Sequence, residues 1–115
     1  MKPGGISIHA VDVARGVPAA GMRVELFALQ PERRPLADGC LGADGLLDHP
    51  VTRGDRIAAG LYEAVFHIGA YLAESGGPTG FLDDVPFRFV VSRAEEHYHL
   101  PLKFTPFGYA LFRGS

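Results

Sequence analysis

The fold is decided by residues 97–115, which read His97-Tyr98-His99-Leu100-Pro101-Leu102-Lys103-Phe104-Thr105-Pro106-Phe107-Gly108-Tyr109-Ala110-Leu111-Phe112-Arg113-Gly114-Ser115. Between residues 97 and 105, apolar and polar side chains alternate with a period of two. This period predicts a strand that buries one face and leaves the other face polar. Both histidines fall on the polar face. The buried face is expected to carry Tyr98, Leu100, Leu102 and Phe104.

After this strand we expect the chain to turn back as a hairpin. Residues 106–108, Pro-Phe-Gly, have the composition of a turn, because Gly takes the left-handed conformation that a three-residue loop needs. A loop of that length would pair Pro101 with Arg113 and His99 with Ser115, all on one face. A loop one residue longer or shorter would change every pair.

Composition indicates one globular domain over residues 1–115, since 47% of the residues are hydrophobic and 21% are charged. The net charge of −2 gives no electrostatic reason to expect a nucleic-acid partner. The single cysteine, Cys40, excludes a disulfide within the chain and suits a reducing compartment. The sequence has no signal-like start and no apolar run that could cross a membrane. We therefore expect a cytoplasmic protein without a membrane partner.

Strand-like patterns recur along the rest of the chain. They are expected at residues 5–13, 22–29, 36–41, 60–67 and 85–91, with a short run starting at residue 46. One short helix is expected at residues 70–75, ended by Gly76-Gly77-Pro78. Seven or eight short strands with frequent turns predict an all-β fold, an antiparallel two-sheet sandwich of the immunoglobulin-like kind.

The candidate chemistry lies on His9, His97 and His99, with Arg113 and Ser115 at the end of the hairpin. One interpretation is a polar, solvent-facing strand face, which is normal for such sheets. A second is a zinc site built from three histidines. A third is acid–base catalysis, because histidine titrates near neutral pH and can activate water. Arg113 and Ser115 would then supply anion binding and a hydroxyl group, or they form only a frayed tail.

Several motifs resemble the transthyretin-like family, and in particular its 5-hydroxyisourate hydrolases. The matching segments are Ile8-His9-Ala10-Val11-Asp12, residues 14–21, Gly69-Ala70-Tyr71, His97-Tyr98-His99-Leu100-Pro101-Leu102 and the terminal Phe112-Arg113-Gly114-Ser115. The resemblance covers almost the whole chain. It implies a transthyretin-like sandwich that pairs into dimers and then into a homotetramer, with active sites at the dimer–dimer interface.

The resemblance also implies an activity, the metal-independent and cofactor-free hydrolysis of 5-hydroxyisourate in urate degradation. The residues that it assigns to catalysis are His9, His99 and Ser115, with Arg113 in the terminal motif that positions substrate. Family members also carry an arginine directly after the Asp-Gly turn.

The sequence departs from the family at two positions expected to line the substrate pocket. Leu46 holds the place of the family arginine after Asp44-Gly45, and Phe112 replaces the usual terminal tyrosine. Loss of one donor that stabilises a developing negative charge typically costs about 10²–10³ in rate. Arg53 or Arg56, in the following loop, are candidates to compensate.

Three hypotheses follow. The first is a hydrolase of 5-hydroxyisourate or a related cyclic imide or ureide, in which histidine-assisted water attacks a ring carbonyl. The second is an enzyme of the same fold that takes a more apolar heterocycle, since Ile8, Leu46 and Phe112 all make the site more apolar. The third is a non-catalytic module that binds a small ligand, against which the retained His9 and His99 argue.

Overall fold

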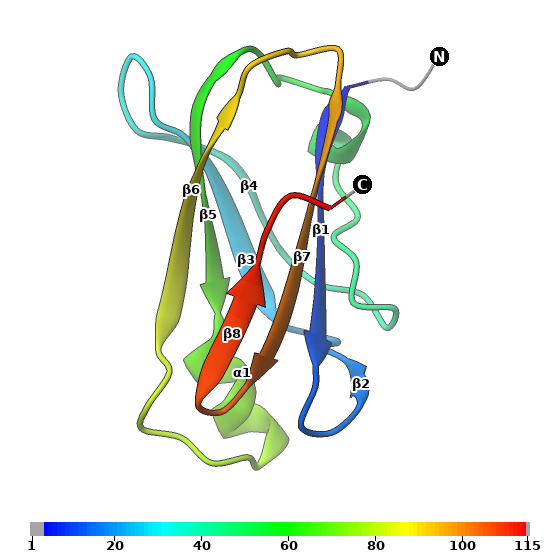
Figure 1. Ribbon diagram of the computed structural model, residues 1–115, viewed down its shortest axis with the longest axis vertical. Coiled ribbons are helices and arrows are strands. Elements are labelled where there is room, and N and C mark those ends of the chain that lie inside the picture. The colour runs from blue at the N-terminus through cyan, green and yellow to red at the C-terminus, as the bar shows by residue number, and fades with distance from the viewer. Residues whose placement is uncertain (1–3, 115) are drawn as a thin grey trace.

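Two four-stranded sheets pack face to face in the computed structural model, which describes residues 4–114 (Figure 1). The first sheet contains β2 (Val17–Pro18), β1 (Gly5–Asp12), β7 (His97–Thr105) and β8 (Gly108–Leu111), in that order. The second sheet contains β4 (Arg34–Cys40), β3 (Arg23–Ala28), β5 (Gly60–His67) and β6 (Asp84–Val91). The predicted all-β sandwich of seven or eight strands is confirmed, with eight strands present in the described residues.

The core lies between the sheets because the strands alternate as their sequences indicate. In β1, Ile6, Ile8 and Ala10 are fully buried, and the residues between them are partly exposed. In β7 the buried set is the predicted one: Tyr98, Leu100, Leu102 and Phe104. The second sheet contributes side chains such as Leu26, Ala64 and Phe66. The polar residues of β1 and β7, His9 and His99 among them, consequently face outward from the first sheet.

One α-helix, α1 (Ile68–Ser75), follows β5 directly and ends at Gly76, whose φ of 77° is left-handed. It begins two residues before the predicted start. Tyr71 fastens the helix to the first sheet, because its hydroxyl donates to the buried Asp12 Oδ2 at 3.1 Å. A short 3-10 helix, η1 (Pro50–Arg53), lies in the long connection before β5. None of the helices in residues 4–114 is long and apolar enough to cross a membrane.

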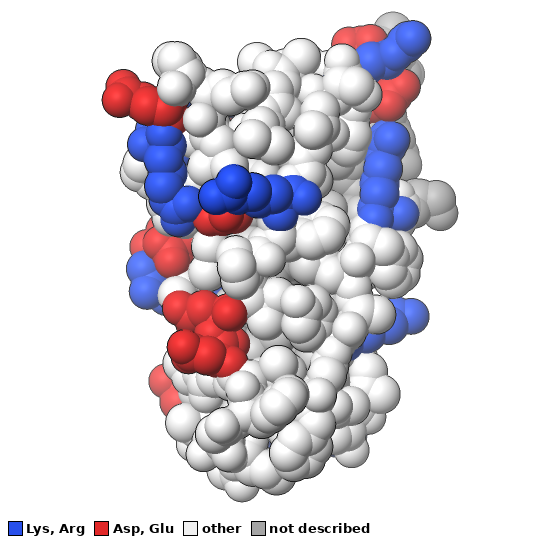
Figure 2. All heavy atoms as spheres, turned by 60° about the vertical axis from the view of Figure 1, so that its left-hand side comes forward, with Lys and Arg blue, Asp and Glu red and all other residues white. Residues whose placement is uncertain are grey.

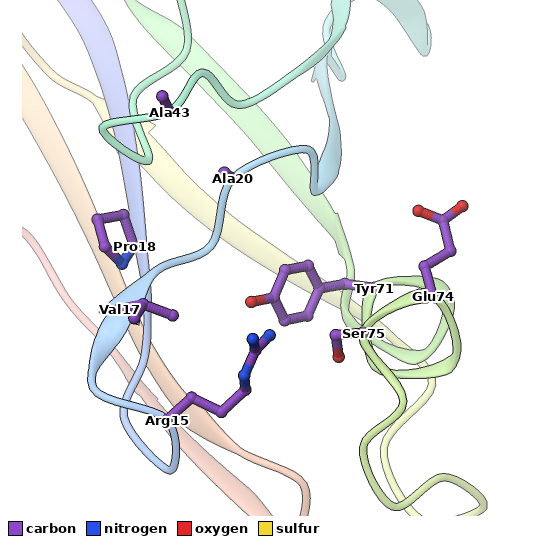
Figure 3. Close-up of a pocket in the computed structure, with 8 residues that line it drawn as sticks. All are labelled: Arg15, Val17, Pro18, Ala20, Ala43, Tyr71, Glu74 and Ser75. Atoms are coloured by element: carbon purple, nitrogen blue, oxygen red, sulfur yellow. The ribbon is translucent and has the colours of Figure 1, made fainter.

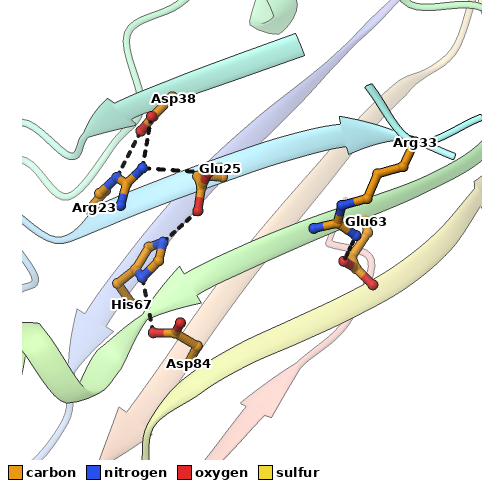
Figure 4. Close-up of polar contacts among 7 residues, drawn as sticks. All are labelled: Arg23, Glu25, Arg33, Asp38, Glu63, His67 and Asp84. Carbon is orange, nitrogen blue, oxygen red and sulfur yellow. Dashed lines mark hydrogen bonds and ion pairs between the residues drawn. The ribbon is translucent and has the colours of Figure 1, made fainter. Parts of the chain in front are cut away.

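Charged side chains form a network on the outer face of the second sheet (Figure 4). Arg23 makes two hydrogen bonds to Asp38 and an ion pair with Glu25, and His67 lies between Glu25 and Asp84. Figure 2 shows Lys and Arg side chains crossing the upper half of a neighbouring face, with clusters of Asp and Glu side chains beside and below them. The two sheets therefore present different outer faces, one with linked charges and one with histidines.

One pair of strands departs from the antiparallel pairing of the rest of the sandwich. β1 and β7 run parallel, with Ser7 paired to His99 and His9 paired to Pro101. Parallel neighbours cannot be joined by a tight turn, and most of the chain lies between these two. Hydrophobic alternation is the same for both strand directions, so the sequence pattern did not distinguish them.

The predicted register of the terminal hairpin is wrong by one residue. Thr105 pairs with Gly108, so the loop consists of residues 106 and 107 only. The Thr105 hydroxyl accepts the Phe107 N–H at 3.2 Å inside this turn, and Gly108 serves as a strand residue. His99 therefore faces Gly114 instead of Ser115. The expected strand at Leu46 is reduced to a single bridge with His9.

Candidate active site

His9 and His99 lie beside each other on the outer face of the first sheet, although they come from opposite ends of the chain. Their strands, β1 and β7, are neighbours. The register partner of His99 on β1 is Ser7, and His9 lies two residues further along β1. The ring centroids are 6.5 Å apart and the ring planes differ by 24°. One small molecule can therefore contact both imidazoles.

The two imidazoles are held differently. His9 Nε2 lies 3.0 Å from the carbonyl oxygen of Asp44. A carbonyl oxygen only accepts, so Nε2 carries the proton and donates it, and Nδ1 of a neutral His9 is left as the accepting nitrogen. His99 Nδ1 lies 2.6 Å from the hydroxyl of Ser7, a group that can donate or accept.

Burial lowers the pKa of His99 below its ordinary value, and the nearby His9 and His97 lower it further. Burial disfavours the charged imidazolium, and the neighbouring rings repel a second positive charge when they are protonated. His99 is therefore neutral at pH 7 and can accept a proton. This is the state that a general base requires.

Each imidazole packs against a glycine. A Cβ atom on Gly45 would lie 3.2 Å from Cδ2 of His9 and 2.7 Å from the Ala10 carbonyl oxygen. A Cβ atom on Gly114 would lie 2.9 Å from Cδ2 of His99. The backbone at Gly45, in the Asp-Gly turn, thus limits the position of the His9 ring. The backbone at Gly114, in the terminal motif, limits the position of the His99 ring.

Leu46 and Phe112 border the histidines. Leu46 forms an antiparallel bridge with His9, and residues that pair in this way project from the same side of a sheet. Its side chain is 40% exposed, and that of Phe112 is 47% exposed. Continuing the hairpin register from the Leu102–Leu111 pair places Phe112 opposite Pro101, on the histidine face. The group beside His9 is therefore apolar, as the sequence indicates.

Arg113 does not lie with the histidines within one chain, which corrects the expected placement. Its guanidinium stacks 4.1 Å above the ring of Tyr98, whose side chain belongs to the core face of β7. It also donates to Glu96 Oε1 at 3.2 Å and to the His97 carbonyl oxygen at 3.4 Å. The one-residue change in register accounts for this position, because it moves residue 113 to the opposite face. Ser115 lies outside the described residues.

Two other expectations can be compared with the described chain. Among residues 4–114, no group of three or more His, Cys, Asp or Glu side chains is arranged to hold a metal ion, so the three-histidine zinc hypothesis finds no ligand cluster. Within the same range, no hydrogen bond joins Arg53 or Arg56 to either imidazole.

Ser7, whose hydroxyl is hydrogen-bonded to His99 Nδ1 at 2.6 Å, was not singled out from the sequence. Its position two residues before His9 on the same strand face was the available signal.

A cavity of about 470 Å³ lies between the loop after β1 and α1, lined by Arg15, Tyr71, Ser75 and five other residues (Figure 3). The Arg15 side chain extends toward the Tyr71 ring in this view. Neither His9 nor His99 lines the cavity. We therefore place the candidate active site on the sheet face.

Residues 6–114 match the family model described as the HIUase/Transthyretin family. The chain belongs to this family. A relative from Rhizobium meliloti (strain 1021), named 5-hydroxyisourate hydrolase 2, is 39% identical over 118 aligned positions, which cover 99% of this chain and 98% of the relative. A 5-hydroxyisourate hydrolase from Mesorhizobium japonicum is 40% identical, over 97% of this chain and 93% of the relative.

Solved structures of similar proteins agree with the fold. The 5-hydroxyisourate hydrolase of Klebsiella pneumoniae superposes with a TM-score of 0.82 at 30% identity, covering 97% of this chain and 99% of that one. An (S)-allantoin synthase superposes with a TM-score of 0.90 at 34% identity, but this chain covers only 44% of it. Transthyretin from Sparus aurata has a TM-score of 0.86 at 23% identity, which supports the fold alone.

Proposed function

We propose that this protein is a hydrolase of 5-hydroxyisourate that acts in urate degradation. The observation that carries this proposal is the pair of imidazoles 6.5 Å apart on one sheet face, in a chain similar over its whole length to relatives that bear this enzyme's name. A carrier module needs no paired imidazoles, one of which is kept neutral by burial. The third hypothesis, a non-catalytic binding module, is therefore not favoured, and the names of the relatives do not favour the second, an enzyme with a different substrate.

In the proposed reaction, water attacks a ring carbonyl of the substrate and the ring carbon–nitrogen bond then breaks. His99 takes a proton from the attacking water and returns one to the leaving nitrogen, which keeps protons balanced over the cycle. His9 holds the water or the substrate through Nδ1, because its Nε2–H is occupied by the Asp44 carbonyl. Ser115 is proposed to position the substrate. No step in this scheme calls for a cofactor.

Leu46 and Phe112 are proposed to form the apolar wall of the substrate pocket. With Leu46 in place of a guanidinium, the oxyanion that develops at the attacked carbonyl lacks a charged donor from this position. Binding through apolar contact with a flat ring is retained. We therefore expect a functional but slower site than one with arginine at position 46.

Arg113 is proposed to hold the terminal tail in place and to make no contact with substrate. Its stacking on Tyr98 and its bonds to Glu96 and His97 hold the segment that leads to Gly114. Gly114 in turn donates its N–H to the His99 carbonyl oxygen at 2.7 Å. Arg113 is thus a positioning residue for the chain beside His99.

The test is the absorbance decay of freshly generated 5-hydroxyisourate with purified protein. We expect faster decay than in buffer, and loss of most of that acceleration in His9→Ala and in His99→Ala, since acid–base groups contribute about 10²–10⁴ in rate. His49→Gln is the matched control, because His49 caps η1 and lies outside the site. Decay at the buffer rate with the wild-type protein would refute the proposal.

We also propose that the active form is a cytoplasmic homotetramer with sites at the dimer–dimer interface. β6 and β8 each form one edge of their sheet, and exposed apolar side chains, among them Val90 and Tyr109, lie on them. Unpaired edges of this kind favour strand pairing with a second copy. The exposed free thiol of Cys40 suits a reducing compartment. Sedimentation equilibrium should give four times the 12.3 kDa chain mass, and a monomer mass would refute this assembly.

A further inference from the structure

Ser7 connects two histidines on the face that carries the candidate active site. Its Oγ lies 2.6 Å from Nδ1 of His99 and 2.8 Å from Nε2 of His97. The parallel pairing of β1 and β7 produces this contact, because it places Ser7 directly beside His99, and His97 one pleat earlier on the same face. All three residues are half-buried. The result is a hydrogen-bonded chain, His97–Ser7–His99, that ends at a reacting imidazole.

A hydroxyl donates one proton, so there are two arrangements in which Ser7 accepts from one ring and donates to the other. In the first, His99 donates from Nδ1 to Ser7, and Ser7 donates to Nε2 of His97, which leaves Nε2 of His99 unprotonated. In the second, His97 donates from Nε2 to Ser7, and Ser7 donates to Nδ1 of His99, which then holds its proton on Nε2. The first arrangement prepares His99 to accept a proton, and the second prepares it to donate one.

On the basis of the proposed hydrolase function, we propose that His97 and Ser7 form a proton relay that converts His99 between these two states during each turnover. His99 Nε2 takes a proton from the attacking water. The proton on its Nδ1 passes to Ser7, and the Ser7 proton passes to Nε2 of His97. His97 then holds the extra charge, and His99 is neutral again with its proton on Nε2.

The relay returns to its first state when the ring nitrogen leaves. His99 gives its Nε2 proton to that nitrogen, Ser7 gives a proton to Nδ1 of His99, and His97 gives one to Ser7. Every proton is accounted for, and His99 does not carry a full positive charge beside His9. This matters because burial and both neighbouring rings disfavour a charged His99.

The charged groups next to His97 are Arg113 and Glu96. The His97 carbonyl oxygen accepts from the Arg113 guanidinium, which is paired with the Glu96 carboxylate, so these two opposite charges offset each other. The other titratable groups near the relay are His9 on β1 and Asp44, whose carbonyl oxygen holds His9. His97 and Ser7 are thus positioning residues that act through His99.

The experiment compares Ser7→Ala with Ser7→Thr, which keeps the hydroxyl on a β-branched side chain suited to a strand, and with His97→Gln, which hydrogen-bonds without titrating. We expect Ser7→Ala and His97→Gln each to lower kcat by about 10- to 100-fold with KM little changed, as loss of a histidine's orienting partner does elsewhere. Ser7→Thr should stay close to wild type. The double variant should be no worse than Ser7→Ala alone, because both changes break one chain.

Long-range proton–nitrogen NMR correlations supply a readout that does not depend on turnover. The ring nitrogen shifts of His99 should change in Ser7→Ala and stay at wild-type values in Ser7→Thr. Wild-type kcat together with unchanged His99 shifts in Ser7→Ala would overturn the relay. If the wild-type protein does not hydrolyse 5-hydroxyisourate, the proposed function fails separately, and the His99 shifts alone decide whether Ser7 controls the tautomer.

Discussion

His9 and His99 differ in the group that holds each ring, and this difference assigns their chemistry. A backbone carbonyl fixes one proton of His9 in place, whereas a hydroxyl lets the proton of His99 move between nitrogens. A fixed ring suits orientation of a ligand. A ring with a movable proton suits proton transfer, so the two histidines are not interchangeable.

The pKa of His99 predicts the acid limb of the pH–rate profile. The reaction needs neutral His99, and its lowered pKa means that it becomes protonated only below 6.5, the usual value for histidine. Activity should therefore persist at pH 6.5 and fall as the pH drops through the lowered pKa. The measurement is kcat/KM against pH, which reports the free enzyme. An acid limb at or above pH 6.5 would contradict this assignment, and His49→Gln should leave the limb unchanged.

Leu46→Arg tests whether the apolar wall limits the rate. An arginine at this exposed position beside His9 would add donors for the developing oxyanion, so we expect kcat/KM for 5-hydroxyisourate to rise about 10- to 100-fold. Stability should change by less than about 0.5 kcal/mol, because the site is on the surface. Leu46→Met, similar in size and uncharged, should give no gain. A fall in kcat/KM for the arginine variant would show that the pocket requires an apolar side chain.

At the scale of elements, the terminal tail after β8 and the helix α1 make different contributions, one to activity and one to stability. The tail lies against His99 and the helix supports the opposite end of the first sheet. Damage to the tail should affect activity, and damage to the contact of α1 should affect stability.

Gly114→Ala tests the tail. The added Cβ would lie 2.9 Å from Cδ2 of His99, a distance at which the ring or the tail must move. We expect kcat to fall by about tenfold or more, since small displacements of a reacting group can cost up to roughly 100-fold, with little change in melting temperature. Gly108→Ala is the control, because a Cβ there meets no atom within 4 Å. Equal activity in the two variants would exclude a positioning role for the tail.

Tyr71→Phe tests the attachment of α1. The variant removes the hydrogen bond to Asp12, a carboxylate that is only 1% exposed and then keeps the backbone N–H of Arg15 as its donor. Loss of one partner of a buried polar group costs about 1–3 kcal/mol. Urea unfolding should show a loss in this range, whereas Tyr109→Phe, at a half-exposed position, should show almost none. An unchanged midpoint for Tyr71→Phe would mean that the hydroxyl contributes nothing.

The sequence predicted each strand by its own pattern, but it could not predict how some strands pair. Alternation in residues 97–105 correctly assigned the buried and polar faces of β7, and so placed His97 and His99 outward. The same alternation fits a parallel or an antiparallel neighbour, so the pairing of β1 with β7 was not predicted. The hairpin register failed because Gly108 could end a three-residue loop or begin a strand, and the local composition allows both.

At the scale of the whole molecule, the site depends on contacts between the two ends of the chain. Ser7 and His99 are 92 residues apart in sequence, and the strand between β1 and β8 in the first sheet is β7. The second sheet, built from the middle of the chain, contributes the other half of the core and no described group at the histidines. The family resemblance predicted that His9 and His99 belong to the site. The role of Ser7 could be inferred only from the parallel pairing, which places its hydroxyl between the rings of His97 and His99.

The parallel pairing of β1 with β7 has a consequence for synthesis on the ribosome. β1 is translated long before the strand that covers its inner edge, because the paired residues Ser7 and His99 are 92 positions apart in sequence. Until β7 is made, Ile6 and Ile8 cannot be buried in a completed core, so the nascent chain exposes an apolar, aggregation-prone strand over this interval. We therefore expect the yield of native protein to depend on translation speed and on chaperone capacity.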